Sequence, residues 1–276
     1  MTQVPHAPIA HRFIGKVAFV TGAARGQGRA EALRLAAEGA DIIALDICED
    51  LPTTTYAGST PEDLAETVRL VEKLDRRIVA RQADIRDFDA VQATVQAGVA
   101  ELGRLDVVIA NAGMTSAARA WEIDAEHWKA TIDINLTGAF HTAKAAIPTM
   151  IEQDSGGSIT FTSSVAGLVG LPMLADYVAA KHGVTGLSKT LANELAPYRI
   201  RVNSVHPFGV ETGLQMTELH PVLDSNPALG TLYMPSLPDG ISQADDIAAA
   251  VAWIASDEAR HVTGIQLPVD LGRTNR

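Results

Sequence analysis

The chain has 276 residues, 47% of them hydrophobic and 20% charged, which is enough to bury a sizeable core and excludes a disordered or fibrous protein. The formal net charge of −11 opposes binding to nucleic acid or to an anionic membrane and favours small molecules as partners. Cys48 is the only cysteine, so an internal disulfide and a thiolate metal cluster are excluded. With no signal-peptide pattern at the start and no apolar run of roughly 18 residues, we expect a cytoplasmic protein.

Short β-rich runs alternate along the chain with longer stretches of helical periodicity. This alternation predicts right-handed crossovers and a doubly wound α/β domain, with a parallel sheet covered by helices on both faces. We expect a single domain over residues 14–276, after a flexible tail at 1–13. The runs predicted as strands are Val17–Val20, Ile42–Leu45, Ile78–Ala83, Leu105–Ala110, Ser158–Ser163, Arg201–His206 and Val262–Val269.

Four stretches between these strands carry apolar residues at helical spacing. One helix is predicted to start at Thr60–Pro61 with Asp63 in its first turn. The predicted buried faces are Ala30/Leu33/Ala37, Leu64/Val68/Val71/Leu74, Val91/Val95/Val99/Leu102 and Trp128/Ile132/Leu136/Phe140.

The first strand runs directly into "TGAARGQGRAEALRLAAEGA", where Gly22, Gly26 and Gly28 lie at a strand-to-helix turn. Glycines let the backbone approach a phosphate, and the helix N-terminus adds unpaired N–H groups. A glycine triplet also occurs in ordinary turns, so the context matters. Asp46 ends the second strand 18 residues after Gly28, where a carboxylate can bond both ribose hydroxyls of an adenosine.

A carboxylate at Asp46 would repel a 2′-phosphate, which favours NAD over NADP as the cofactor. Arg25 in the glycine turn could instead hold a 2′-phosphate or be an ordinary solvated arginine. Asp84 after the third strand could meet the adenine or cap the next helix. "IANAG" follows the fourth strand, where the strand order of a doubly wound sheet reverses and ligands bind, although Asn-Ala-Gly is also a common loop start.

Six motifs in order resemble the short-chain dehydrogenase/reductase family over about residues 14 to 272. They are TGxxxGxG at 21–28, NAG at 111–113, the asparagine of "DINLTGAF", SS at 163–164, YxxxK at 177–181 and "RVNSVHP" at 201–207. The resemblance implies a Rossmann-type, seven-stranded sheet of order 3-2-1-4-5-6-7, NAD as cofactor and the catalytic residues Asn135, Ser164, Tyr177 and Lys181. The expected cofactor contacts are Gly22, Arg25, Gly26, Gln27, Gly28, Asp46, Ile47, Asp84, Ile85, Asn111, Ala112, Gly113, Tyr177, Lys181, Pro207, Val210 and Thr212.

Tyr177 and Lys181 are four residues apart, so on a helix they share a face. An ammonium about 4 Å from the phenolate favours ionisation by roughly 4 kcal/mol at an effective dielectric of about 20, before desolvation is subtracted. We therefore predict Tyr177 as the general base for alcohol oxidation, and as the acid in the reverse direction. The family spacing selects Ser164 over Ser163 to bond the substrate oxygen, and it makes Asn135 part of a proton relay through backbone and water.

Two segments depart from the general family pattern. "PFGVET" keeps Pro207, Val210 and Thr212 but has Phe208 where the family has glycine, which leaves the shape of this loop open. Residues 47–63 form an unusually long connection and resemble the carveol-dehydrogenase-like, mycofactocin-associated branch. That branch implies firmly held NAD and an external redox acceptor such as mycofactocin; a solvent loop without function is the alternative.

Residues 208–243 are rich in Pro, Leu and Met, and in this family such a span folds over the substrate. Its apolar side chains suggest a hydrophobic, terpenoid- or steroid-like alcohol, or else packing on a neighbouring subunit. They are Leu214, Met216, Leu219, Leu232, Tyr233 and Met234. The family also implies a homotetramer.

The function predicted is NAD-dependent interconversion of a secondary alcohol and its ketone. The alternatives are an NADPH-dependent 3-ketoacyl-type reductase and a non-catalytic nucleotide-binding sensor or scaffold. The eight histidines show no metal-ligand spacing, so no metal is predicted.

Overall fold

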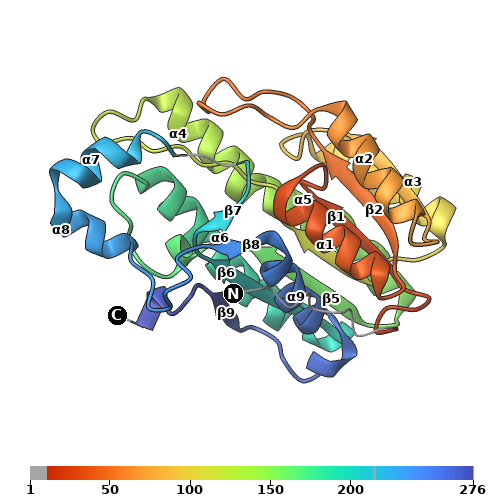
Figure 1. The fold of residues 1–276 in the computed structure, drawn as a ribbon. Helices are drawn as coiled ribbons and strands as arrows, with labels where there is room; N and C mark the ends of the chain where they lie inside the picture. The colour runs from red at the N-terminus through yellow and green to blue at the C-terminus, as the bar shows by residue number, and fades with distance from the viewer. Residues whose placement is uncertain (1–10, 214–215, 276) are drawn as a thin grey trace.

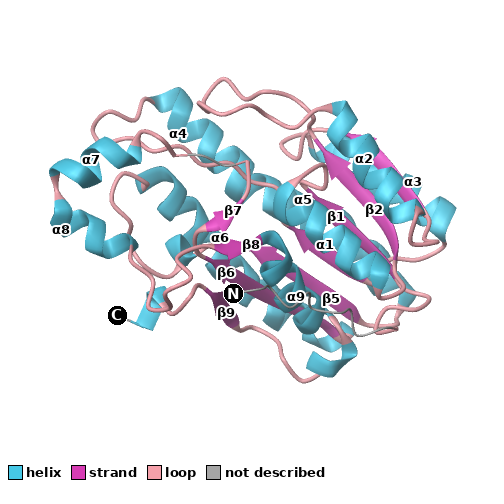
Figure 2. Ribbon diagram, in the orientation of Figure 1, coloured by secondary structure: helices cyan, strands magenta, loops and turns pink. Residues whose placement is uncertain are grey.

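The computed structural model describes residues 11–213 and 216–275, which fold around one parallel sheet (Figures 1 and 2). Its strand order is β3-β2-β1-β4-β5-β6-β9, so the predicted doubly wound, Rossmann-type topology is confirmed. The strands are β1 (Val17–Thr21), β2 (Asp41–Asp46), β3 (Ile78–Gln82), β4 (Val107–Ala110), β5 (Gly157–Thr162), β6 (Ile200–Pro207) and β9 (Gln266–Val269).

Helices cover both faces of the sheet, and the strand residues divide between two apolar layers (Figure 1). On one face α1 packs between α2 and α9, and on the other α5 lies between α3 and α6. Successive residues of a strand point to opposite faces, so Ala18 and Val20 join one layer and Phe19 the other. The helices are α1 (Gly26–Ala37), α2 (Pro61–Glu72), α3 (Phe88–Leu102), α4 (Ala125–Ile132), α5 (Ala139–Gln153), α6 (Ala175–Leu195) and α9 (Ala244–Ala255).

A smaller group of elements lies beyond the carboxyl ends of the strands, outside the two main layers. It includes α7 (Leu219–Ser225) and α8 (Pro227–Gly230), which lie far from the sheet in Figure 1. The short strands β7 (Val210–Glu211) and β8 (Ser242–Gln243) pair with each other at its base and were not predicted. None of the helices in the described parts of the chain is long and apolar enough to cross a bilayer.

The start of the packed domain lies earlier than the sequence predicted. Phe13 is fully buried, and its N–H donates to the carbonyl of Glu38 at 3.0 Å. The Arg12 guanidinium also bonds the buried Glu38 carboxylate, with Nη2 to Oε1 at 2.7 Å. The flexible tail predicted for 1–13 is therefore wrong at its C-terminal end, because Arg12 and Phe13 are anchored to the end of α1. Residues 1–10 lie outside the described chain.

Helix α2 starts as predicted. Thr60 is its N-cap, its hydroxyl accepts the Asp63 N–H at 3.1 Å, and the Asp63 carboxylate accepts the Thr60 N–H at 2.9 Å. This reciprocal pair satisfies donors that the helix itself leaves open, and Pro61 fits the first turn because it has no N–H. The predicted buried faces of α2 and α3 are confirmed at Leu64, Val71 and most of the α3 set.

The predicted buried face of α1 is wrong. Ala30, Leu33 and Ala37 are only partly buried, whereas the fully buried side includes Glu31, Ala32 and Leu35. The buried face of α1 contains Glu31. Hydrophobic periodicity could not identify this face, because carboxylates usually lie in water.

The predicted face along α4 and α5 is also wrong. Trp128 and Phe140 are exposed by 44% and 40%, and Thr131 and Asn135 face the interior instead. A π-helical turn over Asp133–Gly138 separates α4 from α5 and rotates the register, so one continuous helical pattern cannot describe the segment.

Candidate active site

A cavity of about 470 Å³ opens at the carboxyl ends of the parallel strands, where a doubly wound sheet binds ligands. The four predicted catalytic residues Asn135, Ser164, Tyr177 and Lys181 all line it. Among the other predicted cofactor contacts, only Gly28 is absent from the lining. Those that line the cavity are Gly22, Arg25, Gly26, Gln27, Asp46, Ile47, Asp84, Ile85, Asn111, Ala112, Gly113, Pro207, Val210 and Thr212.

The glycine turn forms one wall of this cavity and requires its glycines for different reasons. Gly22 and Gly26 have φ of +71° and +56°, in the left-handed region that glycine adopts without strain. A Cβ at Gly28 would lie 2.1 Å from the carbonyl oxygen of Gly22, so a side chain there would push α1 away from β1. Gly28 thus acts behind the cavity wall, by letting the helix and strand pack closely.

Asp46 closes β2 with its carboxylate turned toward the glycine turn. Oδ2 accepts the Ala24 N–H at 2.9 Å, and Oδ1 accepts the Cys48 N–H at 3.1 Å and the Ser59 hydroxyl at 2.5 Å. A carboxylate can accept about four hydrogen bonds, so the three from the chain leave capacity for a further hydroxyl donor. Cys48 is buried beside it, and burial together with the Asp46 charge raises the pKa of its thiol to about 12.

Arg25 and Asp84 have partners that the sequence did not indicate. The Arg25 Nη2 donates to the Ala57 carbonyl at 2.6 Å. Asp84 pairs with Arg86, whose N–H and Nε both donate to its carboxylate, and the α3 cap is Asp87 instead. The capping alternative for Asp84 is therefore wrong, although Asp84 still lines the cavity.

The loop after β4 is pressed against the glycine turn. The Asn111 amide Nδ2 donates to the Thr21 carbonyl at 3.0 Å, and a Cβ at Gly22 would come within 2.9 Å of the Ala112 Cα. A Cβ at Gly113 would lie 2.8 Å from Oδ1 of Asn135. Any side chain at these glycines would push apart the glycine turn, the β4 loop and Asn135.

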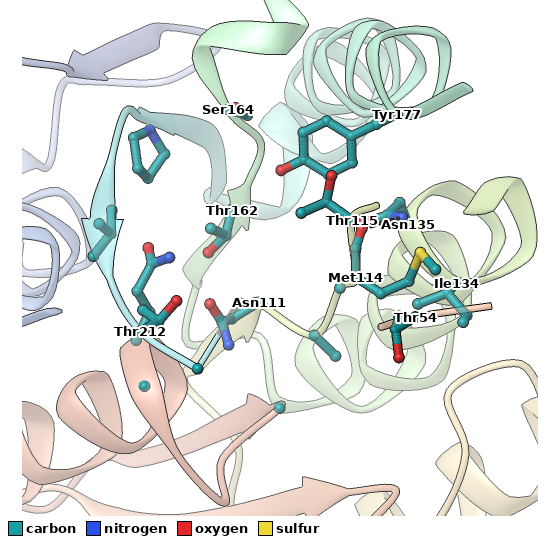
Figure 3. A pocket seen from close by; sticks show the side chains of 18 of the residues that line it. Thr54, Asn111, Met114, Thr115, Ile134, Asn135, Thr162, Ser164, Tyr177 and Thr212 are labelled. Atoms are coloured by element: carbon teal, nitrogen blue, oxygen red, sulfur yellow. Dashed lines mark hydrogen bonds between the residues drawn. The ribbon is translucent and has the colours of Figure 1, made fainter. Parts of the chain in front are cut away.

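Tyr177 and Lys181 line the cavity from α6. Figure 3 shows Tyr177 on this helix and Ser164 just after the end of β5. Lys181 is buried, with Nζ 5.5 Å from the Tyr177 ring centroid and 2.8 Å from the Thr162 carbonyl that it bonds. The Tyr177 side chain faces Ser164, whose hydroxyl lowers the pKa of the phenol. Ser164, Tyr177 and Lys181 therefore meet in one cavity, as predicted.

The electrostatic expectation for Tyr177 needs correction. Burial is the largest influence and raises the pKa of Tyr177 to about 12, against a lowering by the Ser164 hydrogen bond. Burial also lowers the pKa of Lys181 to about 8. The lysine was predicted to bring the phenol toward neutrality, but within the chain itself desolvation outweighs that attraction.

The two adjacent serines point to different places. Ser163 Oγ donates to the Lys181 carbonyl at 3.1 Å, which joins β5 to α6. Ser164 Oγ accepts the Ala166 N–H at 3.2 Å and faces Tyr177, so the two hydroxyls lie on the same side of the cavity. The choice of Ser164 by spacing agrees with this geometry.

Asn135 lies in the π-helical turn with its side chain fully engaged. Nδ2 donates to the carbonyls of Met114 at 2.9 Å and Thr131 at 3.0 Å, and Oδ1 accepts the Met114 N–H at 3.3 Å. The amide has no donor left, so its side chain fastens the β4 loop to the π turn.

The loop after β6 carries Phe208 where the family pattern has glycine. Gly209, one residue later, has a φ of +54° and provides the left-handed turn. Phe208 packs with the apolar cluster of the smaller group of elements beyond the strand ends, and a Cβ at Gly26 would be 3.4 Å from Cγ2 of Thr212. The substitution at Phe208 therefore leaves Thr212 against the glycine turn.

Two covers close over the cavity. The first is the segment 47–60, which reaches across to the β4 loop where Thr115 N donates to the Tyr56 hydroxyl at 3.2 Å. The second is the segment 208–243, whose Tyr233 hydroxyl donates to the Pro172 carbonyl at 2.5 Å. Met216 and Tyr233 from this second cover line the cavity; Leu214 lies outside the described residues.

Several cavity residues were missed by the sequence. Tyr56, Thr115, Leu171 and Leu174 all line it but belong to no motif. The length of the 47–63 connection was the only signal for Tyr56, and no pattern pointed to the others.

In the described parts of the chain, no group of three or more His, Cys, Asp or Glu side chains is placed to hold a metal ion. His182 is exposed, with Nδ1 2.9 Å from the Val178 carbonyl, and does not line the cavity.

Comparison with known proteins gives concordant matches. The chain is 43% identical over 274 residues to (-)-trans-carveol dehydrogenase of Rhodococcus erythropolis, covering 95% of this chain and 99% of that protein. A short chain dehydrogenase from Mycobacterium paratuberculosis, solved bound to NAD, superposes with a TM-score of 0.94 at 48% identity, covering 96% of this chain and all of that one. Carveol dehydrogenase from Mycobacterium avium, solved in complex with NAD, gives a TM-score of 0.91 at 48% identity, covering 97% and 100%. The family described as short chain dehydrogenase matches residues 16–221, and this chain belongs to it.

Proposed function

We propose that this protein is an NAD-dependent oxidoreductase that interconverts a secondary alcohol and its ketone, with Tyr177 as the general acid and base. The observation that carries the proposal is the shared cavity. Ser164, Tyr177 and Lys181 converge at one part of it, and the glycine turn and Asp46 line another. A proton-transfer group and a dinucleotide-shaped groove are thus adjacent.

The residues present fit NAD. The left-handed turn at Gly22 and Gly26 leaves the backbone open to a phosphate, and Asp46 retains hydrogen-bonding capacity for ribose hydroxyls. Arg25 bonds the Ala57 carbonyl, which argues against its use for a 2′-phosphate. NAD would supply the hydride acceptor and, when oxidised, a positive charge in the site.

The chain's own residues would handle the proton. Ser164 would donate a hydrogen bond from its hydroxyl to the substrate oxygen and stabilise the charge that develops there. Tyr177 in its phenolate form would take the alcohol proton, and positive charge in the site would favour that form against the burial effect on its pKa. Because the Asn135 amide has no free donor, a relay through Asn135 would use its main chain and water.

The substrate we infer is a hydrophobic, ring-containing secondary alcohol of the terpenoid type. Leu171, Leu174, Met216 and Tyr233 give the cavity an apolar end next to Tyr177. The relatives named carveol dehydrogenase support this class, since carveol is a cyclic terpenoid alcohol.

We also infer that the segment 47–60 holds the cofactor firmly. It is fastened at Arg25, at Asp46 through Ser59, and at Thr115 through Tyr56. Cofactor retained between turnovers would need an external acceptor such as mycofactocin for reoxidation.

A homotetramer is proposed for the quaternary structure. Trp128 and Phe140 on α4 and α5 leave an apolar stripe exposed, and Trp253 on α9 adds a second exposed site. Light scattering of the purified protein would measure the mass directly.

The test is to denature the purified protein, identify the released nucleotide by mass spectrometry, and assay NAD-loaded protein with carveol. We expect NAD in the release and formation of the ketone, with repeated turnover only when an artificial electron acceptor is added. Recovery of NADP would contradict the role of Asp46, and failure to oxidise carveol or cyclohexanol even once would contradict the proposed reaction.

A further inference from the structure

A fully buried histidine lies behind the catalytic serine. His206, near the end of β6, has Nδ1 2.7 Å from the Ser164 carbonyl oxygen and Nε2 2.8 Å from Ser204 Oγ. It does not line the cavity, and the proposed chemistry does not use it.

The position of His206 is explained by where the two strands separate. The β5–β6 ladder has its last pair at Thr162 and Val205, and Ser163 N still donates to the Val205 carbonyl at 2.9 Å. Ser164 then turns away while β6 continues. Its carbonyl oxygen leaves the ladder and accepts two hydrogen bonds instead, one from the Gly167 N–H at 2.8 Å and one from the imidazole of His206. The imidazole is the side-chain donor of this pair.

The two partners fix the tautomer of His206. A carbonyl oxygen can only accept, so Nδ1 carries the hydrogen and donates it to Ser164. Nε2 is then the acceptor, and the Ser204 hydroxyl donates to it. Burial, with smaller effects of Lys181, Lys189 and His182, lowers the pKa of His206 to about 4, so the ring stays neutral near pH 7.

Ser164 is held at two atoms. Its carbonyl oxygen accepts from His206 Nδ1 and from the Gly167 N–H, and its Oγ accepts the Ala166 N–H at 3.2 Å. Its backbone is extended, with φ of −169° and ψ of 166°. Rotation of the peptide that follows Ser164 would break the bond from His206 and move Oγ relative to the Tyr177 hydroxyl.

We propose that His206 is a positioning residue for the reaction: as the neutral Nδ1–H tautomer, it anchors the Ser164 carbonyl so that the serine hydroxyl stays directed at the substrate oxygen. This rests on the proposed function for the role of Ser164. Ser204 sets the tautomer, so the chain of donors runs from Ser204 through His206 to Ser164.

The first test uses unaltered protein and no substrate. In ¹⁵N-histidine NMR, His206 should show a protonated Nδ1 and an unprotonated Nε2, without titration between pH ~5 and ~8, whereas an unperturbed histidine titrates near ~6.5. Ser204→Ala should change the Nε2 shift of the same residue. A hydrogen on Nε2, or titration near the ordinary value, would overturn the proposal even if no variant folds.

The second test compares variants in a single turnover of NAD-loaded protein with carveol. His206→Leu should slow hydride transfer about 10- to 100-fold, since small misplacement of reacting groups costs rates of this order. His206→Asn can place an amide donor near the Nδ1 position and should recover the rate to within about threefold of wild type. NAD retention and the carveol KM should stay unchanged in both.

Ser164→Ala separates the two hypotheses. If Ser164→Ala loses activity but His206→Leu keeps more than a third of the wild-type rate, the positioning role is wrong and the proposed function stands. If Ser164→Ala itself has no effect, the role of the serine in the proposed function is wrong.

Discussion

The floor and the covers of the cavity are held in different ways. The floor, formed by the end of β5, the π-helical turn and α6, has its polar groups bonded to neighbouring regular elements, as at Lys181 with Thr162 and Ser163 with Lys181. The covers at 47–60 and 208–243 depend on a few contacts between residues distant in the sequence, as at Arg25 with Ala57 and Tyr233 with Pro172. We therefore expect the floor to determine the reaction rate and the covers to determine how long ligands stay bound.

The largest effect on the reaction rate is expected from a substitution in the floor of the cavity, at Lys181. Lys181→Met would remove the buried ammonium whose Nζ lies 5.5 Å from the Tyr177 ring and would leave the Thr162 carbonyl without its donor. We expect a loss of at least about 10²-fold in the single-turnover rate, the usual worth of acid–base catalysis. An exposed lysine, Lys129→Met, is the matched control and should keep the wild-type rate. A loss of less than tenfold at Lys181 would show that the floor does not control the chemistry.

The next largest effect is expected on stability, from a change at Glu31, a buried carboxyl on α1. Glu31 is fully buried with neither oxygen hydrogen-bonded, and burial raises its pKa to about 8. The folded protein binds the proton that the unfolded chain releases above pH ~4.5, so stability is greatest below that pH and falls as pH rises toward 8. Glu31→Gln should therefore raise the free energy of unfolding at pH 7, by at most about 3 kcal/mol.

Glu38 provides the control for this measurement, because it is equally buried but paired with Arg12 and Arg34. Glu38→Gln should lower the free energy of unfolding, since it removes the buried negative charge that Arg12 and Arg34 both bond. Urea unfolding of both variants between pH ~5 and ~8 gives the comparison. Destabilisation by Glu31→Gln, or a pH dependence of the opposite sign, would contradict the account.

The covers should affect retention more than chemistry. Arg25 joins both covers, because its guanidinium bonds Ala57 and a Cβ at Gly213 would lie 3.0 Å from its Cζ. Arg25→Met should speed NAD dissociation about tenfold, corresponding to a charged-donor hydrogen bond of about 1.5 kcal/mol. The single-turnover rate should change less than about threefold. Exposed Arg81→Met on β3 is the control, and equal dissociation from both variants would show that the covers do not hold the cofactor.

The smallest effect is expected at Tyr56. Tyr56→Phe removes only the hydroxyl that accepts the Thr115 N–H, a bond worth about 1 kcal/mol. NAD dissociation should rise a fewfold, measured by displacement of bound reduced cofactor, whose fluorescence reports binding. A change larger than that of Arg25→Met would reverse the ranking of the two contacts.

The sequence predicted the end of β5, the glycine turn and the Tyr177–Lys181 pair, because each depends on spacing within one element or one strand-to-helix turn. It did not predict the π-helical turn, which also belongs to the floor. The covers could not be predicted, because Tyr56 meets Thr115 only after the whole domain has folded. The predicted faces of α1 and α4–α5 failed for physical reasons: Glu31 is a buried carboxyl, and the π turn at Asp133–Gly138 shifts the helical register.

The most direct measurement of the central claim is the single-turnover rate of NAD-loaded Tyr177→Phe with carveol, beside wild type. Phenylalanine keeps the ring of this partly buried residue and removes only the phenolic oxygen beside Ser164. The account predicts a fall of at least about 10²-fold with NAD still bound. A fall of less than tenfold would contradict the assignment of Tyr177 as the proton-transfer group.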